Sequence, residues 1–453
     1  MSDSRLFGWD QVHPAPGQIV TPQQRLPWFP TTMLSIQHVI AMFGSTVLAP
    51  LLMGFDPNVA VLMSGIGTLI FFVITGGQVP SYLGSSFAFI GVVLAATGFA
   101  GKGHNPNVAV ALGGIIACGV VYMLIGALVA ATNRRQRRLQ STVAGLEVDE
   151  IEDGTAAHWI ERLMPPVVTG AVVAVIGLNL AQIPIKNMAP TGFDAWMQVV
   201  TFLSVGLVAV YTRGMVQRLL ILVGLILASI VYAVLTNGLG MGTPVDVSAI
   251  VAAPWFGLPQ FTAPVFKAEA MLLIAPVAVI LVAENLGHLK AVSAMTGVDM
   301  NPYIGRAFIA DGLATVVSGS AGGTGVTTYA ENIGVMAATK IYSTAMFVVA
   351  ALCAIVLGLS PKFGALIHAI PLAVMGGVSI VVFGLIAMSG AKIWVDNRVD
   401  FTQNGNLLVA AITIILGTGD FTLRFGTLAL SGIGTATFGA ILLNALLNRR
   451  RFA

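Results

Sequence analysis

Two acidic side chains occur in stretches that are otherwise apolar. Glu331 lies in Thr327–Lys340 (TTYAENIGVMAATK), just after the glycine-rich run Ser318–Gly325 (SGSAGGTG), and Glu284 lies in the run LVAENLGH, four residues before His288. A carboxyl group at the centre of a bilayer costs about 2.5–3.5 kcal/mol on insertion scales. Irregular backbone at that depth is tolerated only inside protein or beside a cavity. These stretches therefore predict a polar binding site inside a membrane protein.

Glu284 and His288 are spaced i, i+4, so they share one face of a helix. A carboxyl group beside an imidazole is a suitable proton relay, because histidine exchanges protons near neutral pH. The pair could instead be a polar contact near a helix end, but the second acid in a broken helix makes us favour function. It is not a zinc motif by itself, since no further ligand follows at a suitable spacing.

Glu331 lies where a new helix would begin after the glycine-rich run. The backbone N–H groups of a helix N-terminus stabilise a carboxylate and can donate to the carbonyl groups of a ligand. Glu331 could instead serve only the helix, as an acid does in a capping box. Thr327 and Thr328 could take that role, so we favour a ligand-binding role for Glu331.

Ser81–Gly91 (SYLGSSFAFIG) resembles the stretch around Glu331, because in both a polar start with a tyrosine leads into a short apolar helix. Phe87 would either contact a planar ligand or simply pack, and the sequence does not decide between the two. His38, in the first apolar run, is equally open between packing hydrogen bonds and support of the site. For Asp311, a third acid in an apolar run, we favour a hydrogen bond to a neighbouring helix.

Carboxylate acceptors, backbone donors and an aromatic side chain together suit a small planar molecule that has both N–H and C=O groups. A cationic amine would also suit two acids, and physical chemistry alone does not exclude it. The apolar runs contain no nucleophile with a base, metal-ligand cluster or phosphate loop, so an enzyme is not indicated.

The composition is that of a polytopic, all-α membrane protein. Of 453 residues, 56% are hydrophobic and only 9% are charged, whereas soluble domains carry about 25% charge. The first 30 residues have no apolar signal sequence, so we expect the first spanning helix to direct insertion. About 14 runs fit a complete or broken span, near 32–52, 58–75, 82–99, 108–132, 163–183, 194–212, 216–236, 269–290, 304–320, 328–340, 342–359, 366–390, 404–418 and 425–447.

Lysine and arginine are concentrated in alternate loops, which predicts the orientation. With both termini in the cytoplasm, only a few of the 22 Lys and Arg residues face outside, namely Lys102, Lys186, Lys267, Lys362 and Arg424. The loop 133–157 begins basic and continues acidic. It is either a regulatory loop or a solvated loop whose arginines fix the topology, and we favour the second.

Similar features recur in the two halves of the chain. The broken stretches match each other, and Pro165–Leu178 resembles Pro371–Leu385. Because a repeat of seven spans is odd, the second repeat must be inverted in the membrane. Inverted repeats with paired broken helices are typical of secondary transporters. We therefore predict two inverted seven-helix repeats, in which helices 3 and 10 are broken by short extended stretches.

Glu331–Lys340 (ENIGVMAATK) resembles the signature of the nucleobase–ascorbate transporter family, an acid or Gln followed by Asn, Gly, Thr and a basic residue at fixed spacing. Three more blocks resemble that family in the same order: QHVIAMFGSTVLAP, YLGSSFAFIG and AENLGHL. The similarity extends from around Leu26 to Asn448 and is closest to bacterial uracil and pyrimidine permeases of that family. The loop 133–157 is longer than the family pattern.

The resemblance implies a core domain and a gate domain, each built from both repeats. It implies a homodimer in the bacterial inner (cytoplasmic) membrane that moves the core against the gate, with the lipid bilayer and a nucleobase as partners and no nucleic acid. The expected boundaries are an N-terminal cytoplasmic tail at 1–30, core parts at 31–132 and 265–360, the charged loop at 133–157, and gate parts at 158–240 and 361–448.

The resemblance also implies roles for individual residues. Glu284 and Glu331 would bind the base, and Phe87 and Ala330 would offer backbone N–H groups beside Tyr329. Phe383 lies where uracil permeases can carry tyrosine, so any polar contact made there is lost. The supporting and proton-coupling residues would be His288 (holding Glu284), His38 and Asn332.

The implied activity is proton-coupled import of uracil or a related pyrimidine, with no cofactor beyond the coupled proton. Uracil is uncharged near neutral pH, so its accumulation needs a coupled ion. The alternatives are a xanthine or uric-acid permease of the same family and, more remotely, an anion exchanger of the same architecture. An anion exchanger should have a basic residue, or no acid, where this sequence has Glu331.

Overall fold

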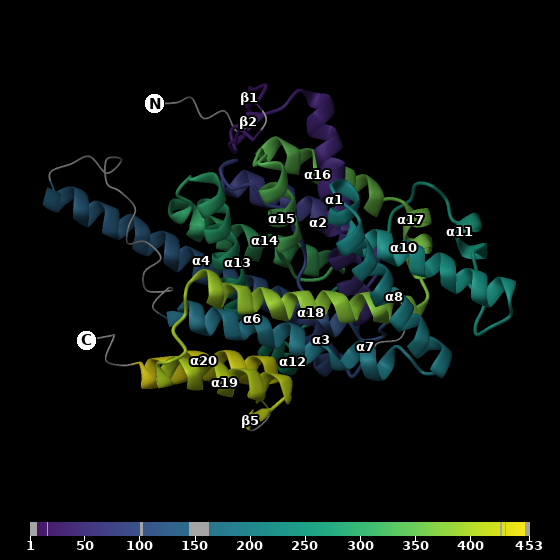
Figure 1. The fold of residues 1–453 in the computed structure, drawn as a ribbon. Coiled ribbons are helices and arrows are strands. Elements are labelled where there is room, and N and C mark those ends of the chain that lie inside the picture. The colour runs from purple at the N-terminus through teal and green to yellow at the C-terminus, as the bar shows by residue number, and fades with distance from the viewer. Residues whose placement is uncertain are drawn as a thin grey trace.

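The computed structural model describes residues 7–15, 17–99, 103–144, 163–425, 428–430 and 432–448, which form a mainly helical fold (Figure 1). Within these residues, eight helices are long and apolar enough to cross a membrane, or nine if the bent pair α16 (Thr344–Gly358) and α17 (Pro361–His368) counts as one span. The eight are α1 (Trp28–Met53), α2 (Pro57–Ile74), α4 (Val108–Ala144), α6 with α7 (Pro166–Leu180, Gln182–Asn187), α8 (Gly192–Tyr211), α10 (Leu220–Ala233) with a π-helical turn (Val234–Gly238), α12 with α13 (Ala268–Ile274, Val277–Thr296) and α18 (Leu372–Asp396).

Further helices and strands belong to the described fold. The helices are α3 (Ala88–Thr97), α9 (Met215–Arg218), α11 (Ser248–Ala252), α14 (Ile304–Ala321), α15 (Ala330–Thr339), α19 (Asn404–Thr418) and α20 (Gly432–Leu447). Three pairs of short strands accompany them: β1 (Asp10–Gln11) with β2 (Gln24–Arg25), β3 (Leu83–Ser85) with β4 (Val326–Thr328), and β5 (Leu423–Phe425) with β6 (Leu428–Leu430).

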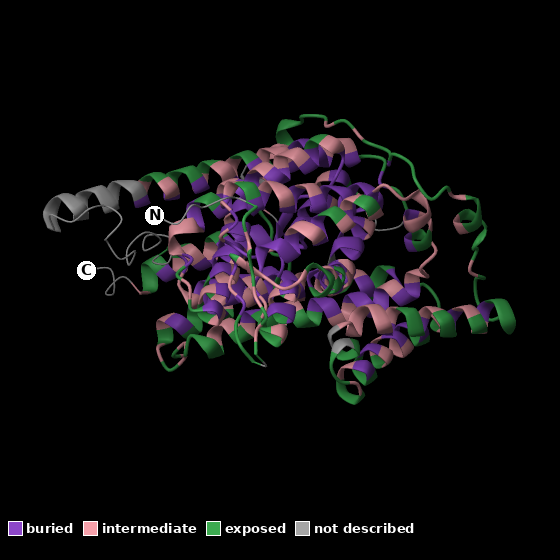
Figure 2. Ribbon diagram, turned by 90° about the horizontal axis from the view of Figure 1, so that it is seen from above, coloured by how far each residue is buried: buried purple, intermediate pink, exposed green. Residues whose placement is uncertain are grey.

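The surface of the helices is that of a membrane protein. Leu124, Leu207 and Leu442 are each more than half exposed, whereas the buried residues are concentrated where the helices pack together (Figure 2). Soluble proteins rarely expose extensive apolar patches. A surface covered by such side chains faces lipid.

Some predicted boundaries need correction. Helix α4 continues to Ala144, so the first part of the predicted loop 133–157 is helical, and the rest of that loop lies outside the described residues. The span predicted at 366–390 begins only at Leu372, because Pro371 disfavours helical backbone at the residue before it. The residues before that proline form the separate helix α17.

The two predicted breaks in the helices are confirmed. β3 precedes α3, β4 precedes α15, and the strands pair antiparallel with Gly84 opposite Thr327. Extended backbone in a membrane protein must find its hydrogen-bond partners inside the protein. Each of these strands provides them for the other.

The helices pack in two groups. In the first group (α1–α4 and α12–α16), α14 packs on α4 and α2, α16 packs on α2 and α1, and α13 packs on α4 and α15. In the second group (α6–α10 and α18–α20), α18 packs on α6 and α8, and α19 packs on α6 and α20. Figure 1 shows α18, α6, α19 and α20 lying below α2, α14 and α15. The groups meet where α3 and α13 contact α6, where α13 contacts α20, and where α1 contacts α10 and α18.

The segment before α1 is docked on the first group. The Val20 N–H donates to the Lys340 carbonyl at 3.0 Å, and the Val20 carbonyl accepts from the Tyr342 N–H at 2.9 Å. Trp9 Nε1 donates to Thr344 Oγ1 at 2.9 Å. The predicted N-terminal tail therefore holds the turn between α15 and α16.

Val20→Asp should lower the thermal stability of the purified protein, because Val20 is 0% exposed and an unpaired buried carboxyl group is costly. Ile19→Asp is the matched control, since the neighbouring side chain is 40% exposed. We expect the unfolding midpoint in detergent to fall by about 5 °C for Val20→Asp and to change little for the control. Equal midpoints would contradict a docked segment.

Candidate functional site

A cavity of about 600 Å³ lies between the two helix groups, beside the starts of α3 and α15. The second group contributes mainly aliphatic side chains, among them Val173, Ile176, Ile221, Val382, Leu385 and Ile386. The first group contributes most of the residues that the sequence predicts for the site: Phe87, Glu284, His288, Tyr329, Ala330 and Glu331. Stretches more than 200 residues apart in the chain therefore form one polar wall.

The starts of α3 and α15 bring backbone N–H groups to the cavity, and at α3 the Ala88 N–H donates to Ser86 Oγ at 3.3 Å. Both helices begin at the cavity directly after the paired strands, at Ala88 and Ala330. The first N–H groups of a helix have no partner within that helix. The antiparallel pairing of β3 with β4 thus brings two helix N-termini, each with a partial positive charge, to one cavity.

The two carboxyl groups reach the cavity from different helices. Glu284 lies within α13 and Glu331 in the first turn of α15, and both are half-buried. Within the described residues, the Oε2 atom of Glu284 is buried and has no hydrogen-bond partner. A buried acceptor left unpaired costs about 1–3 kcal/mol. A ligand N–H or a proton at this atom would therefore be stabilising.

The contact of His288 differs from the expected one. Its Nδ1 lies 2.8 Å from the Oγ1 of Thr328, at the end of β4, rather than against Glu284. The i, i+4 spacing places both side chains on the cavity face of α13, but the imidazole is bonded to the strand. His288 thereby attaches α13 to the strand that precedes Glu331.

Tyr329 uses its hydroxyl group inside the protein. The hydroxyl donates to the Ser85 carbonyl at 2.8 Å and accepts from Thr46 Oγ1 at 3.1 Å. The side chain is only 3% exposed. Its phenol therefore braces the end of β4 against β3.

The other three predicted residues lie behind the cavity wall. Phe383 is buried and packs edge-to-face on Phe87, with ring centroids 5.8 Å apart. Asn332 donates from Nδ2 to His38 Nδ1 at 2.9 Å and to the His38 carbonyl at 3.2 Å. These contacts fix the Phe87 ring and attach α15 to α1.

Asp311 makes the kind of contact that the sequence favours for it. Its Oδ2 accepts from Asn285 Nδ2 at 2.6 Å and from Thr327 Oγ1 at 3.3 Å. Asn285 belongs to α13 and Thr327 to β4. Asp311 therefore joins α14 to a helix and a strand that position the cavity, without lining it.

The sequence reasoning missed one end of the cavity. Ser389, Lys392 and Asp396 line it from α18, spaced i, i+3 and i+7 on one face. The spacing of these polar residues in an apolar helix could have predicted that they line a cavity. The aliphatic lining residues could not have been predicted, because such residues are typical of every membrane helix.

Comparison with known proteins gives clear matches. A model of the permease family matches residues 29–146 and 151–425. The chain is 63% identical over 432 residues to the protein of Escherichia coli (strain K12) named "Putative pyrimidine permease RutG", covering 95% of this chain and 92% of that protein. It is 38% identical over 445 residues to the uracil permease of Paenibacillus larvae subsp. larvae (strain NRRL B-3650 / LMG 16245), covering 95% and 97%. The solved transmembrane domain of a cyanobacterium bicarbonate transporter, BicA, resembles the fold with a TM-score of 0.57 at 15% identity, covering 94% of this chain and 100% of that chain.

Gly84→Ala should disturb the paired strands. A Cβ atom at Gly84 would lie 2.4 Å from Tyr329 Cε2 and 2.6 Å from Thr46 Oγ1, closer than packed atoms approach. Such overpacking typically costs about 1–3 kcal/mol. Gly206→Ala is the control, since a Cβ there meets nothing within 4 Å. We expect a lower unfolding midpoint for Gly84→Ala alone, and unchanged stability would contradict the close contact.

Proposed function

We propose a specific activity for this chain, which belongs to the permease family: proton-coupled import of uracil or a related pyrimidine base across the cytoplasmic membrane. Its relatives are transporters, and the chain is a transporter rather than an enzyme. The observation that carries the proposal is the cavity where Glu284 and Glu331 meet two helix N-termini. Relatives named as pyrimidine and uracil permeases support the choice of substrate.

The base is bound by matching donors to acceptors. Uracil carries N–H and C=O groups around a flat ring. In the proposed complex, the carboxyl groups of Glu284 and Glu331 accept the ring N–H groups, and the backbone N–H groups of Phe87 and Ala330 donate to the ring carbonyls. The unpartnered Oε2 of Glu284 supports this arrangement. The Phe87 ring, held by Phe383, borders the bound base.

The proposed topology has about 14 spans in two inverted repeats, with β3–α3 and β4–α15 as the broken third and tenth. The first helix group is the core domain and the second is the gate domain. Both termini are cytoplasmic, and two copies form a homodimer. The separate packing of the two groups supports the division into core and gate.

Coupling to a proton follows from the two acids. Two carboxyl groups at one cavity repel each other when both are charged. Protonation of one of them removes this repulsion, so the site that holds the base is more stable with one proton bound. A less charged site also moves more easily within a bilayer. One proton driven by ~100 mV contributes about 2.3 kcal/mol, which supports roughly 50-fold accumulation of a neutral base. Alternating access results when the core moves the site past the gate.

Glu331→Gln should abolish measurable uracil binding, because an amide replaces one acceptor by a donor without changing the size of the side chain. The control is Glu269→Gln, an exposed acid at the start of α12. Binding of tritiated uracil to purified protein measures the effect. Wild-type affinity in Glu331→Gln would contradict the assignment of Glu331.

Uptake should collapse when a protonophore removes the proton gradient, and it should not require sodium. The measurement is labelled uracil uptake into proteoliposomes, with an imposed pH gradient and with sodium or choline as the salt. Uptake that persists without a proton gradient but needs sodium would exclude proton coupling.

A xanthine or uric-acid permease is the second candidate, because a cavity of about 600 Å³ does not restrict the site to a single ring. An uptake panel of labelled uracil, thymine, xanthine and adenine distinguishes the two candidates. An anion exchanger is disfavoured because Glu284 and Glu331 both line the cavity beside the two helix N-termini. The likeness to BicA is one of fold and does not extend to its substrate.

A further inference from the structure

A second cavity, of about 750 Å³, lies near the other end of α18. Leu372 and Met375 line it, whereas α18 borders the first cavity from Val382 onward. About two helical turns, roughly 10 Å, separate Met375 from Val382. Directly after Met375, the residues Gly376–Ser379 are buried. The two cavities are thus separated by packed protein along α18.

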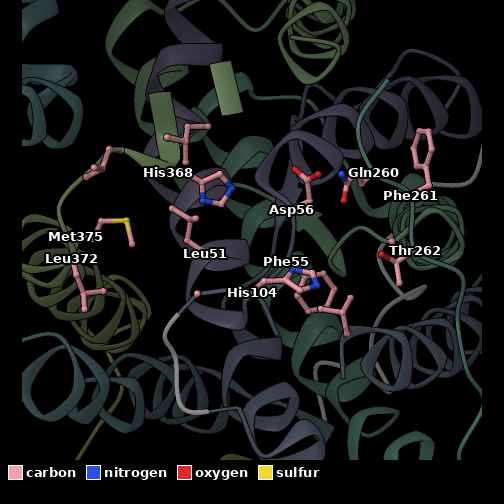
Figure 3. Close-up of a pocket in the computed structure, with 16 residues that line it drawn as sticks. Leu51, Phe55, Asp56, His104, Gln260, Phe261, Thr262, His368, Leu372 and Met375 are labelled. Atoms are coloured by element: carbon pink, nitrogen blue, oxygen red, sulfur yellow. The ribbon is translucent and has the colours of Figure 1, made fainter. Parts of the chain in front are cut away.

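The second cavity has both apolar and polar lining residues. Among the apolar ones, Phe55 and Ile367 are buried. Figure 3 shows that its polar side chains come from separate parts of the chain: Asp56 before α2, His104 before α4, Gln260 and Thr262 before α12, and His368 at the end of α17. Both helix groups and the segments that connect them therefore contribute to it.

These side chains provide both kinds of hydrogen-bonding group. The Asp56 carboxylate is fixed in place, because its Oδ1 accepts from the Asn58 N–H at 2.8 Å. Asp56 also lines the cavity, where its other oxygen can accept from a ligand N–H. Gln260 and the two imidazoles can donate to ligand carbonyls. A planar ring edged with N–H and C=O groups matches these acceptors and donors beside apolar lining residues.

We infer that this cavity is a second, weaker binding site for the same class of neutral planar base. The buried stretch of α18 that begins at Gly376 separates it from the cavity that contains Glu284 and Glu331. The inference rests on the proposed function. His104, Gln260 and His368 are exposed. Hydrogen bonds to exposed groups replace bonds to water and add little affinity. Such a site holds a base briefly before the first cavity becomes accessible.

The first test uses purified Glu331→Gln protein, in which the first cavity should not bind. Saturation-transfer NMR with uracil as the probe should still detect weak contact with the protein. Adding His368→Ala and Gln260→Ala to that variant should remove the signal, and adding Lys362→Ala, on α17 but outside the cavity, should not. No signal in Glu331→Gln, or a signal that survives both added substitutions, overturns the inference.

The second test measures transport in the otherwise wild-type protein. His368→Ala with Gln260→Ala should raise the KM for uptake roughly three- to ten-fold, leaving the equilibrium Kd for uracil unchanged. An unchanged KM in the double variant overturns the inference. Normal uracil uptake by the wild-type protein would then leave the proposed function intact. Failure of the wild-type protein to bind or transport uracil overturns both. Lys362→Ala again serves as the control.

Discussion

The pairing of β3 with β4 is the constraint on which the candidate site depends. Extended backbone among membrane helices must be satisfied by the protein, since each unsatisfied group costs several kcal/mol in hydrocarbon. The two strands satisfy each other, and neighbouring threonines add to this: Thr315 Oγ1 donates to the Val326 carbonyl at 3.0 Å, and the Leu83 N–H donates to Thr68 Oγ1 at 2.9 Å. Helices α1 and α2 pack on β3, and α13 and α14 pack on β4. The positions of both helix N-termini and of Glu284 therefore follow from one short sheet.

Close contacts at glycine stiffen each helix group from within. A Cβ at Gly119 of α4 would lie 2.7 Å from the Gly312 carbonyl oxygen of α14, and a Cβ at Gly170 of α6 would lie 2.8 Å from the Gly390 carbonyl oxygen of α18. Small residues let helix backbones approach where no hydrophobic effect drives them together. Between the groups lies a cavity with an aliphatic wall instead. Close backbone approach at these glycines thus lies within each group, whereas the cavity lies between the groups.

The sequence predicts those parts of the site whose signals are local. A glycine-rich run before a polar helix start places Glu331 at a helix N-terminus, and hydrophobic length identifies most helices. It does not predict which partner a side chain takes. His288 bonds to Thr328, 40 residues away, and the Tyr329 hydroxyl bonds to a carbonyl on the other strand, and both choices depend on strand pairing. The extension of α4 was also missed, because hydrophobicity ends near 132 while arginine and glutamine remain good helix formers beyond it.

The distribution of polar groups between the two helix groups suits a moving site. Glu284, Glu331 and both helix N-termini belong to the first group, whereas the second group faces them with aliphatic side chains. If the hydrogen bonds to the base were divided between the groups, each cycle would break some of them, at about 0.5–1.5 kcal/mol for each bond. In the proposed mechanism, with these acceptors and donors on one group, the bound base would move with that group past a wall that is mainly aliphatic. Ser389, Lys392 and Asp396 occur only toward one end of that wall, where they line the cavity without dividing the polar site between the groups.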